Sequence, residues 1–421
     1  MPITRRAFVA STAAAAGAYA LAPDALLRAA HAGAAGTFRV GVVGCGGRGT
    51  GAAENMLEAS PQTAIVALAD VFPDRLESCR QRLATLGDRS KVATDRCHTG
   101  FDAYKALLAG DVDLVILATP PHFRPAHFAE AVAKGKHVFL EKPVAVDPVG
   151  ARAVLAAAAD ADAKRLCVVA GTQRRHERCY LEAMKRVADG AIGPLVAARA
   201  TWNMGGLWMN PRKPEWSDME WQLRNWLYFT WLSGDHIVEQ HVHNLDVVSW
   251  ATGAHPTRAI GMGGRQVRVQ PAYGHVFDHF AVEYHYPSGL FCESFARQTD
   301  GCASRVDEWL HGTKGICHTM SGAAEITGEK PWKFDGENGN PYVQELVDLI
   351  AAINSGKPVN EAKTVAESTL TAIMGRMSAY TGKEITWEQA MSSKLELRPP
   401  AYAMGPLATP DVAVPGRTPI E

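Results

Sequence analysis

The sequence predicts an α/β domain built on a doubly wound parallel sheet, followed by an α+β domain with a mainly antiparallel open sheet. The chain has 421 residues, which is too long for one ordinary core and fits two domains. In the first half, short and almost continuously apolar runs alternate with helical segments, as in parallel sheets covered on both faces. Further along, strand patterns dominate, and two of them are joined by a tight turn. We therefore expect domains at residues 37–171 and 172–395, a terminal segment at 1–36 and an arm at 396–421.

The composition favours a packed globular protein, since 47% of the residues are apolar and 21% are charged. The 43 Lys and Arg residues nearly balance the 44 Asp and Glu residues, and the net charge is −1. We therefore expect the mature protein to bind neither nucleic acid nor a membrane, because it has no basic excess. The eight Cys residues form no C-x-x-C pair, so neither a zinc knuckle nor a dithiol motif is predicted.

Residues 1–36 have the features of an export signal. Arg5 and Arg6 precede the uncharged, alanine-rich run Phe8–Ala22, and Ala30-His31-Ala32 is a cleavage candidate of the A-x-A type. The paired Arg followed by a spaced Phe is similar to the twin-arginine signal, which predicts a periplasmic or otherwise exported protein. A short membrane anchor is the alternative, although the run is short and weakly apolar for a span of about 20 residues.

The first domain is predicted from five short apolar runs of strand type, and three of the four segments between them contain a predicted helix. The predicted strands are Phe38–Val43, Thr63–Ala69, Asp113–Ala118, Lys136–Leu140 and Arg165–Ala170. The predicted helices are Thr50–Glu58, Pro125–Lys134 and Pro148–Asp160.

A glycine-rich turn joins the first strand to the first helix. It reads Gly44-Cys45-Gly46-Gly47-Arg48-Gly49, which is G-x-G-x-x-G in the required context of strand, turn and helix. The first Gly allows the tight turn, the second lets the backbone approach a pyrophosphate, and the third lets the helix pack on the strand. The helix N-terminus then faces the anion. The turn therefore predicts a dinucleotide site formed by Gly44, Gly46, Gly47, Arg48 and Gly49.

Asp70 ends the second strand, 21 residues after Gly49. An acid at this place accepts hydrogen bonds from the ribose hydroxyls of the adenosine and repels a 2′-phosphate. The sequence therefore favours NAD over NADP as the cofactor, although the neighbouring Arg75 could accommodate a phosphate. The alternative is an ordinary surface Asp in the loop between a strand and a helix.

Three further strand ends carry polar side chains, and ligands of such sheets bind beyond the carboxyl ends of the strands. Two of these ends have unusual sequences, Thr119-Pro120-Pro121-His122 and Glu141-Lys142-Pro143. The third carries Gln173 and Arg174, with Tyr180 following, and these could reach a substrate or the nicotinamide. We therefore expect a cofactor or substrate to contact Thr119, Pro120, His122, Glu141, Lys142, Gln173, Arg174 and Tyr180.

The second domain is predicted as a mainly antiparallel sheet backed by helices. The alternating run before the turn Ser288-Gly289 predicts a hairpin. The arm at 396–421 is rich in Pro and is expected to be either loose or wrapped over a neighbouring subunit. The predicted strands are Pro194–Met204, Arg258–Val269, Phe277–Tyr286, Leu290–Arg297 and Ser304–Gly312, and the predicted helices are Tyr342–Asn354 and Glu361–Thr381.

Six of the ten Trp residues lie between residues 201 and 231, together with Arg224 and Asn225. Trp rings stack on the apolar faces of sugars, and Arg or Asn can bind the hydroxyl groups, so this segment is a candidate substrate site. An aromatic core or a subunit interface is the more common use of such residues, and we expect only one or two of these Trp at the pocket.

The motifs together resemble the Gfo/Idh/MocA family of NAD(P)-dependent sugar and polyol oxidoreductases over residues 37–395. The resemblance implies a Rossmann domain, an α+β domain whose open sheet often builds oligomers, and hence a homo-oligomer, a dimer or a tetramer. It also implies a small carbohydrate as the substrate. The segments that carry it are the glycine-rich turn, Ala69-Asp70-Val71, Thr119-Pro120-Pro121-His122, Glu141-Lys142-Pro143, Ser233–Gly253 and Gly312-Thr313-Lys314-Gly315.

In this family, the Lys of E-K-P and a downstream Asp-x-x-x-His pair carry the hydride-transfer chemistry. The resemblance therefore implies that Lys142, Glu239 and His243 are catalytic, with Glu239 standing where the family has Asp. A spacing of four places Glu239 and His243 on one helical face, where the carboxylate could orient the imidazole of a general acid/base. Lys142 as a helix cap, a purely structural His243, and a metal site that includes His236 are the alternatives.

The resemblance implies an oxidoreductase that transfers a hydride between a sugar or polyol hydroxyl carbon and bound NAD. A second class remains open, because some relatives use tightly held NAD to cleave glycosides by oxidation, elimination, water addition and re-reduction. Export is compatible with that use, whereas the intact Glu141-Lys142-Pro143 segment favours net oxidoreduction. A non-catalytic sugar-binding protein is the minor alternative, and no metal is expected.

Overall fold

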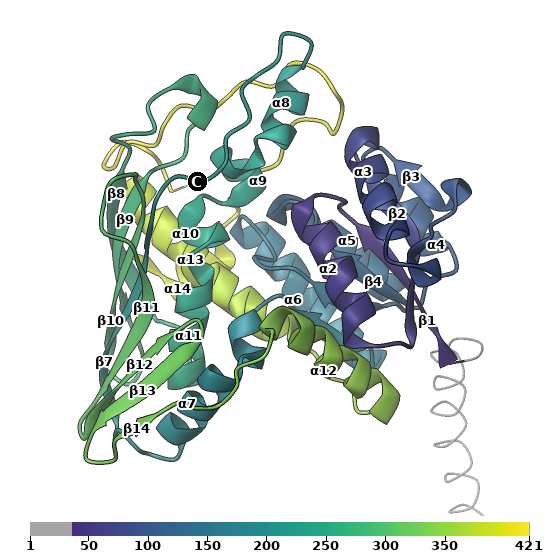
Figure 1. The fold of residues 1–421 in the computed structure, drawn as a ribbon. Coiled ribbons are helices and arrows are strands. Elements are labelled where there is room, and N and C mark those ends of the chain that lie inside the picture. Colours follow the sequence, from purple (N-terminus) through teal and green to yellow (C-terminus); the bar gives the residue numbers. More distant parts are fainter. Residues whose placement is uncertain (1–35, 421) are drawn as a thin grey trace, which may run out of the picture.

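The computed structural model describes residues 36–420 as two sheets with helices packed around them (Figure 1). The predicted twin-arginine signal and its cleavage site lie outside the described residues. Among the described helices, none combines the length and apolar character that a membrane span requires.

The first sheet is a six-stranded parallel sheet with the order β3-β2-β1-β4-β5-β6. The order reverses between β1 and β4, which leaves a crevice at their carboxyl ends. This confirms the predicted doubly wound sheet; the short β3 was not predicted. The strands are β1 (Phe38–Val43), β2 (Thr63–Asp70), β3 (Cys97–Thr99), β4 (Leu114–Leu117), β5 (His137–Leu140) and β6 (Val168–Ala170).

Helices cover both faces of this sheet, because its strands are apolar on both sides. One face packs on α2 (Gly47–Ala59), α3 (Pro73–Ala84) and α12 (Pro341–Ser355). The other face packs on α4 (Ala103–Ala109), α5 (Arg124–Ala133), α6 (Pro148–Ala163) and the start of α13 (Ala362–Thr381). The sequence did not predict α3 or α4. It also assigned α12 to the second domain, whereas α12 completes the core of the first.

The second sheet has nine strands in the order β14-β13-β12-β11-β7-β10-β9-β8-β15. Only β7 and β10 pair in parallel, so the predicted antiparallel character is confirmed. The predicted hairpin joins β9 to β10. The strands are β7 (Leu195–Met204), β8 (Arg258–Gly264), β9 (His279–His285), β10 (Phe291–Gln298), β11 (Arg305–Gly312), β12 (Gly315–Met320), β13 (Ala323–Gly328), β14 (Trp332–Lys333) and β15 (Ile385–Thr386).

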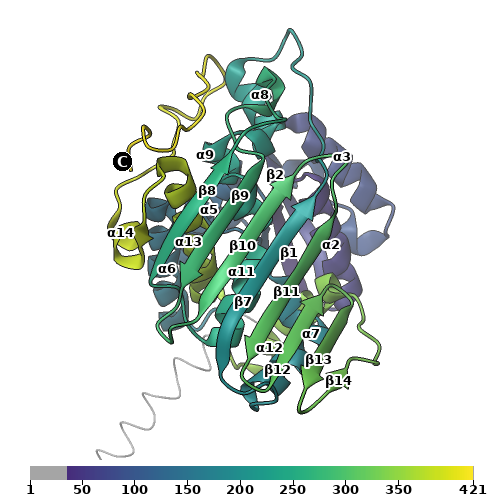
Figure 2. The ribbon, with the colours of Figure 1, turned by 90° about the vertical axis from the view of Figure 1, so that its left-hand side faces the viewer.

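One face of the second sheet packs on α7 (Arg178–Ala188), α11 (Val242–Thr252) and α13, and the other face is open (Figure 2). The open face carries the exposed side chains Ile260, Met262, Phe291, Phe295 and Met320. The sheet is therefore open, as predicted, because β14 and β15 form two separate edges and one face has no covering helix.

The predicted helical stretch at Ser233–Gly253 is broken into α9 (Thr230–Ser233), α10 (His236–Glu239) and α11. Asp235 stands between α9 and α10 with a φ of 72°, a conformation that few non-glycine residues adopt. Its carboxylate stabilises the break by accepting hydrogen bonds from the amides of His236 and Phe277. A second interruption follows at His241, whose amide bonds five residues back. Glu239 and His243 therefore do not share one continuous helix, and the prediction that their spacing of four places them on one helical face is wrong.

The C-terminal arm lies against its own chain, which contradicts the prediction of a loose arm; its wrapping over a neighbouring subunit stays a prediction. The amide of Leu397 donates to Asp147 at the start of α6, and the amide of Gly416 donates to the Thr381 carbonyl. Between these points the arm runs beside α8 (Asp218–Arg224), as Figure 1 shows in yellow. The short helix α14 (Trp387–Ser392) precedes the arm.

Candidate active site

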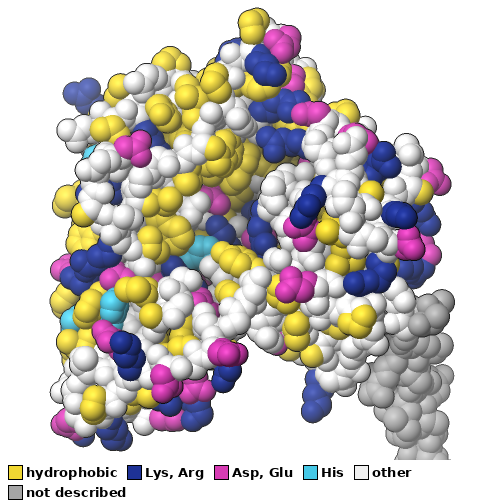
Figure 3. All heavy atoms as spheres, viewed as in Figure 1, with side chains coloured by type: hydrophobic (Ala, Val, Ile, Leu, Met, Phe, Trp, Pro, Cys, Tyr) yellow, Lys and Arg dark blue, Asp and Glu magenta, His cyan; other side chains and the backbone are white. Residues whose placement is uncertain are grey.

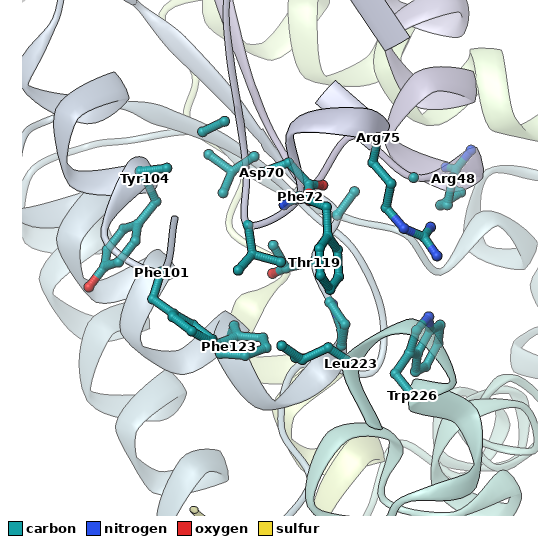
Figure 4. A pocket seen from close by; sticks show the side chains of 18 of the residues that line it. Arg48, Asp70, Phe72, Arg75, Phe101, Tyr104, Thr119, Phe123, Leu223 and Trp226 are labelled. Atoms are coloured by element: carbon teal, nitrogen blue, oxygen red, sulfur yellow. Dashed lines mark hydrogen bonds between the residues drawn. The ribbon is translucent and has the colours of Figure 1, made fainter. Parts of the chain in front are cut away.

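A cavity of about 380 Å³ opens at the crevice between β1 and β4 (Figure 4). The space-filling view shows a hollow between the two sheets, with hydrophobic side chains on its walls (Figure 3). Seven of the predicted cofactor residues line the cavity, and so do several residues that the sequence did not single out. The predicted residues are Gly44, Gly46, Gly47, Arg48, Asp70 and Thr119 with Pro120; the others include Phe72, Arg75, Phe101, Tyr104, Phe123 and Trp226.

The glycine-rich turn leaves room for a ligand because no side chain fits within it. Gly44 has a φ of 95°, and a Cβ there would meet the Ala118 backbone at 2.6 Å. A Cβ on Gly49 would lie 1.7 Å from the Gly44 carbonyl oxygen. A Cβ on Gly47 would meet open space, and one on Gly46 only the Arg75 guanidinium. With α2 starting at Gly47, these residues fit the pyrophosphate of a dinucleotide.

Asp70 lines the same cavity, beside the glycine-rich turn. One carboxylate oxygen accepts the amide of Cys45 at 2.7 Å and the other accepts the amide of Phe72 at 2.8 Å. Burial raises the pKa of Asp70, and the two backbone donors oppose that rise. The Asp70 carboxylate is thereby fixed beside the glycine-rich turn, where it fits the ribose diol. Arg75 on α3 also lines the cavity.

The Thr119–His122 strand end divides into two parts. Thr119 and Pro120 line the cavity, and the Thr119 hydroxyl shares a hydrogen bond of 3.3 Å with His127. His122 turns to the C-terminal arm, where its Nε2 shares a hydrogen bond of 2.8 Å with the Tyr402 hydroxyl. Burial lowers the pKa of His122 to about 4, so its ring is neutral at pH 7. His122 therefore stands behind the cavity wall.

Lys142 points across to the second domain. Its Nζ donates to the backbone carbonyl of Glu239 at 2.6 Å and to the Glu239 Oε1 at 3.2 Å. Both side chains are nearly buried, with exposed fractions of 12% and 10%. Lys142 does not cap the next helix, because α6 is capped by Asp147. The peptide bond between Lys142 and Pro143 is cis, a point that the sequence left open.

Arg48 and Glu141, both predicted to bind the cofactor, form an ion pair with each other. Arg48 also pairs with Glu345 of α12 at 2.9 Å, and its guanidinium lies 5.0 Å from the centre of the Tyr342 ring. Glu141 accepts the backbone amide of Lys142 at 3.2 Å. This network joins the glycine-rich turn to Lys142. The sequence analysis missed its α12 members because nothing local to them indicates a site.

His243 is buried, and its ring stacks on Trp202 with centroids 5.8 Å apart. Its Nδ1 has no hydrogen-bond partner, so the predicted carboxylate–imidazole bond is not formed and Glu239 instead holds Lys142. Burial lowers the pKa of His243 well below its usual value, and the charges of Lys142 and Arg174 lower it further. The imidazole is therefore neutral at pH 7 and can accept a proton.

The alternative of a metal site gains no support from the geometry. His236 packs against the ring of Phe280, with centroids 5.0 Å apart, and both of its ring nitrogens lack hydrogen-bond partners. Within residues 36–420, no group of three or more His, Cys, Asp or Glu side chains is arranged to hold a metal ion.

Arg174 and Tyr180 do not present free polar groups to a substrate. Arg174 forms an ion pair with Glu308, and the Tyr180 hydroxyl donates to the same carboxylate at 3.0 Å. Both side chains are buried, since Glu308 lies on the helix-covered face of β11. The prediction that they bind substrate directly is corrected on this ground. Gln173 differs, because its buried Oε1 has no hydrogen-bond partner.

Arg224 and Asn225 are also engaged elsewhere. Arg224 makes two hydrogen bonds to Asp74 of α3, at 2.9 and 3.0 Å, and thereby bridges the two domains. Asn225 is fully buried and bonds the Ala272 carbonyl. They position α8 and do not present free polar groups. Among the six Trp of this segment, Trp208 and Trp226 line the cavity, which matches the expected one or two.

A parallel sheet with a glycine cradle at the reversal of its strand order, closed by a second domain, is the architecture of a dinucleotide-dependent oxidoreductase. Two family models match the chain: the oxidoreductase family with an NAD-binding Rossmann fold over residues 38–170, and the GFO/IDH/MocA C-terminal domain over residues 180–318. The chain belongs to the Gfo/Idh/MocA family, as its motifs suggested. It is an enzyme of the NAD-binding oxidoreductase type.

Among curated proteins, the inositol 2-dehydrogenase of Rhizobium meliloti is 24% identical over 344 residues, covering 77% of this chain and 91% of that protein. The 2,7-anhydro-N-acetylneuraminate hydratase of Escherichia coli is 27% identical over 179 residues, covering 42% of this chain and 44% of that protein. A solved levoglucosan dehydrogenase, in complex with NADH and levoglucosan, has a TM-score of 0.67 at 16% identity, over 83% of this chain and 99% of that one. The solved structure shows the shared fold.

Proposed function

We propose that the protein is an exported NAD-dependent oxidoreductase that transfers a hydride between a hydroxyl carbon of a sugar or polyol and bound NAD. The observation that carries this proposal is the pairing of Lys142 with Glu239, next to a neutral, buried His243. A cation at the carboxyl end of β5 and a proton acceptor on α11 suit the removal of a proton from a hydroxyl group.

Bound NAD would supply the hydride acceptor, and the chain would supply the proton transfer and charge stabilisation. His243 is neutral at pH 7, so it takes the hydroxyl proton as the carbon is oxidised. The Lys142 ammonium stabilises the negative charge that develops on that oxygen. Glu239 holds Lys142 in place and does not contact the imidazole.

The decisive experiment incubates the purified protein with NAD and a panel of sugars, cyclic polyols and aryl glycosides. A dehydrogenase accumulates reduced cofactor in proportion to the substrate consumed. Lys142→Met and His243→Ala should each lower kcat by about 10²–10⁴-fold. Asn354→Ala, in an exposed contact far from these residues, serves as the matched control. If the panel gives no turnover and Lys142→Met still binds a sugar as the parent does, a non-catalytic sugar-binding protein is the better description.

A redox-neutral, NAD-dependent glycoside hydrolase is the second candidate. It is supported by the match to a hydratase, a protein named for adding water. Such an enzyme would cleave a glycoside without added NAD, and reduced cofactor would appear only transiently. Net accumulation of NADH with an unglycosylated polyol would count against it.

We propose that NAD binds more tightly than NADP, because the fixed Asp70 carboxylate favours the ribose diol and repels a 2′-phosphate. Arg75 opposes this preference. Calorimetric titration of cofactor-stripped protein should give a lower Kd for NAD, and Asp70→Ala should narrow the difference. A lower Kd for NADP in the parent protein would overturn the assignment.

Export by the twin-arginine route is also proposed, on the strength of Arg5 and Arg6 before a weakly apolar run. Replacing both with Lys should keep the precursor in the cytoplasm, since the route reads the Arg pair. Delivery of the double variant to the periplasm at the parent's level would refute the proposal.

A homo-oligomer is proposed through the open face of the second sheet, because Ile260, Met262, Phe291 and Phe295 are exposed there. Light scattering should show a dimer or tetramer for the parent and a monomer for Met262→Glu. Leu86→Glu, at an exposed position of the first domain, should leave the parent's mass unchanged. A monomeric parent would contradict the proposal.

A further inference from the structure

The wall of the cofactor cavity is backed by a residue from the far end of the chain. Phe101 and Phe123 line the cavity. The ring of Tyr402, in the C-terminal arm, lies 5.9 Å from the centre of each of these two rings. Its hydroxyl shares the hydrogen bond of 2.8 Å with His122, the neighbour of Phe123. Tyr402 therefore fixes the side of the cavity formed by the end of β4.

The same stretch of the arm is also bonded to α8 of the second domain. The Gly405 carbonyl accepts the amide of Met219 at 3.1 Å, and the Leu407 carbonyl accepts the Gln222 side chain at 2.9 Å. The amide of Leu407 donates to Asp218 at 3.1 Å. These three contacts attach the arm to the first five residues of α8.

The attached helix leads directly into the cavity. Leu223, at the end of α8, and Trp226, just beyond it, are lining residues, and Figure 4 shows Leu223 beside Phe123 with Trp226 near Arg75. Between them, Arg224 donates two hydrogen bonds to the carboxylate of Asp74 at the start of α3. The cavity is thus closed by a segment that is bonded to the first domain on one side and to the arm on the other.

We propose that residues 397–407 form a strap that retains the cofactor, with Tyr402 as its positioning residue. The strap begins where Leu397 bonds Asp147 and ends where Leu407 bonds Asp218. It crosses from the first domain to α8 and holds the two walls of the cavity together. This inference rests on the proposed binding of NAD, and it adds a structural reason for slow release of the bound cofactor. Because the strap limits how far these walls can separate, it slows the release of a bound dinucleotide.

The strap is tested by the rate at which bound NADH leaves the protein, measured by stopped-flow fluorescence after mixing with excess NAD. Tyr402→Ala removes the ring and the hydroxyl and should raise this rate about tenfold or more, while Tyr402→Phe, which loses one hydrogen bond, should raise it about threefold. Tyr402 is 48% exposed, so both variants should fold. The matched control is Met404→Ala, an exposed residue of the same strap, which should release NADH at the parent's rate.

A second variant that ends at Arg398 removes Tyr402 and the contacts to α8 together, and it should release NADH at least as fast as Tyr402→Ala. If Tyr402→Ala and the truncated chain both release NADH at the parent's rate, the strap is wrong while NAD binding stands. If the parent binds neither NADH nor NADPH, the proposed function is wrong, and the strap, which depends on it, is wrong as well. Faster release with an unchanged melting temperature supports the strap, because a general loss of stability would lower that temperature.

Discussion

At the scale of single residues, the ion pair of Lys142 and Glu239 is the contact on which the proposed mechanism depends. Each neutralises the other in a nearly buried place, and removing one partner of such a pair leaves a charge without compensation. Asp would be one methylene shorter than Glu at this position. The pair joins the end of β5 to the end of α10, so it also ties the two domains together.

This pairing predicts that the effects of Lys142→Met and Glu239→Gln on the free energy of unfolding are not additive. Lys142→Met should lower the free energy of unfolding by about 3 kcal/mol, because the Glu239 carboxylate stays buried without its cation. Adding Glu239→Gln should restore part of that loss, whereas the activity should stay low in both variants, since Lys142 is absent from each. Urea denaturation and initial rates check the two effects. Strictly additive stabilities would show that the two side chains do not interact.

Trp202 is a second important residue, since its ring packs on the imidazole of His243 in place of a hydrogen-bonded carboxylate. Because the pKa of His243 lies well below its usual value, the rate of hydroxyl oxidation should stay level from pH 8 to pH 6. Trp202→Leu should admit water to the ring and raise that pKa. A raised pKa protonates the base at higher pH, so the acid limb of kcat should then move upward.

Trp202→Phe provides the control, because it keeps an aromatic face against His243. It should retain the level profile, while Trp202→Leu should lower kcat by up to about twofold at pH 6.5, because water can at most restore the ordinary imidazole pKa of about 6.5. Equal pH profiles for parent, Phe and Leu variants would assign Trp202 a packing role only.

At the scale of elements, the turn from β1 to α2 depends on the absence of a side chain at Gly49. A Cβ there would lie 1.7 Å from the Gly44 carbonyl oxygen, a contact that no rotamer change can relieve. Gly49→Ala should therefore destabilise the first domain by more than about 2 kcal/mol and abolish NAD binding. Gly51→Ala, where a Cβ meets open space within the same helix, should instead add about 0.5–1 kcal/mol. Thermal unfolding of both variants checks the contrast.

Helix α12 is the element whose place was least visible in the sequence. Its residues Leu346 and Leu349 are fully buried among side chains of the first sheet and α2. Leu349→Ala should cost about 2–5 kcal/mol of unfolding free energy by opening a cavity there. The loss should appear in NAD affinity as well, because Glu345 of the same helix holds Arg48. An unchanged NAD affinity at reduced stability would separate α12 from the cofactor site.

At the scale of the whole molecule, several buried histidines make the fold sensitive to acid. Burial lowers the pKa of His127 and His241 to about 3 and that of His275 to about 4. In the unfolded chain they titrate near 6.5, so below that pH the unfolded state binds more protons than the folded state. Stability is therefore full above pH 6.5 and is lost as the pH falls towards 4, by up to about 1.4 kcal/mol per pH unit for each histidine.

Urea denaturation between pH 7.5 and pH 5 measures this loss. His241→Asn removes one titrating ring and should reduce the slope of stability against pH by about one proton. His176 acts in the opposite sense, because its carboxylate neighbours Asp348 and Glu361 raise its pKa to about 10. Its contribution to stability is full below about pH 6.5 and is lost as the pH rises from there to about 10. A stability that is independent of pH below 6.5 would contradict the prediction.

The sequence by itself determined the parts of this protein that depend on local pattern. The apolar runs of β1, β4 and β5 are buried on both sides, so their pattern predicts a parallel sheet without any knowledge of what covers it. The glycine-rich turn and Asp70 occupy one loop and the next strand end, and their spacing alone brings them to one cavity. The E-K-P segment ends a strand beside them for the same reason.

Only the tertiary structure decided which side chains meet across the two domains. Glu239 was expected to hold His243 because both were placed on one helix, but a break at His241 turned the carboxylate to Lys142. Arg174 and Tyr180 were expected at the substrate, but β11 brings Glu308 to them. Tyr402 of the arm and its partner His122 are 280 residues apart along the chain. At such a separation, no spacing pattern in the sequence indicates that two residues meet. Contacts of that kind follow from how whole sheets and helices pack, because packing selects partners by shape and burial and not by their separation along the chain.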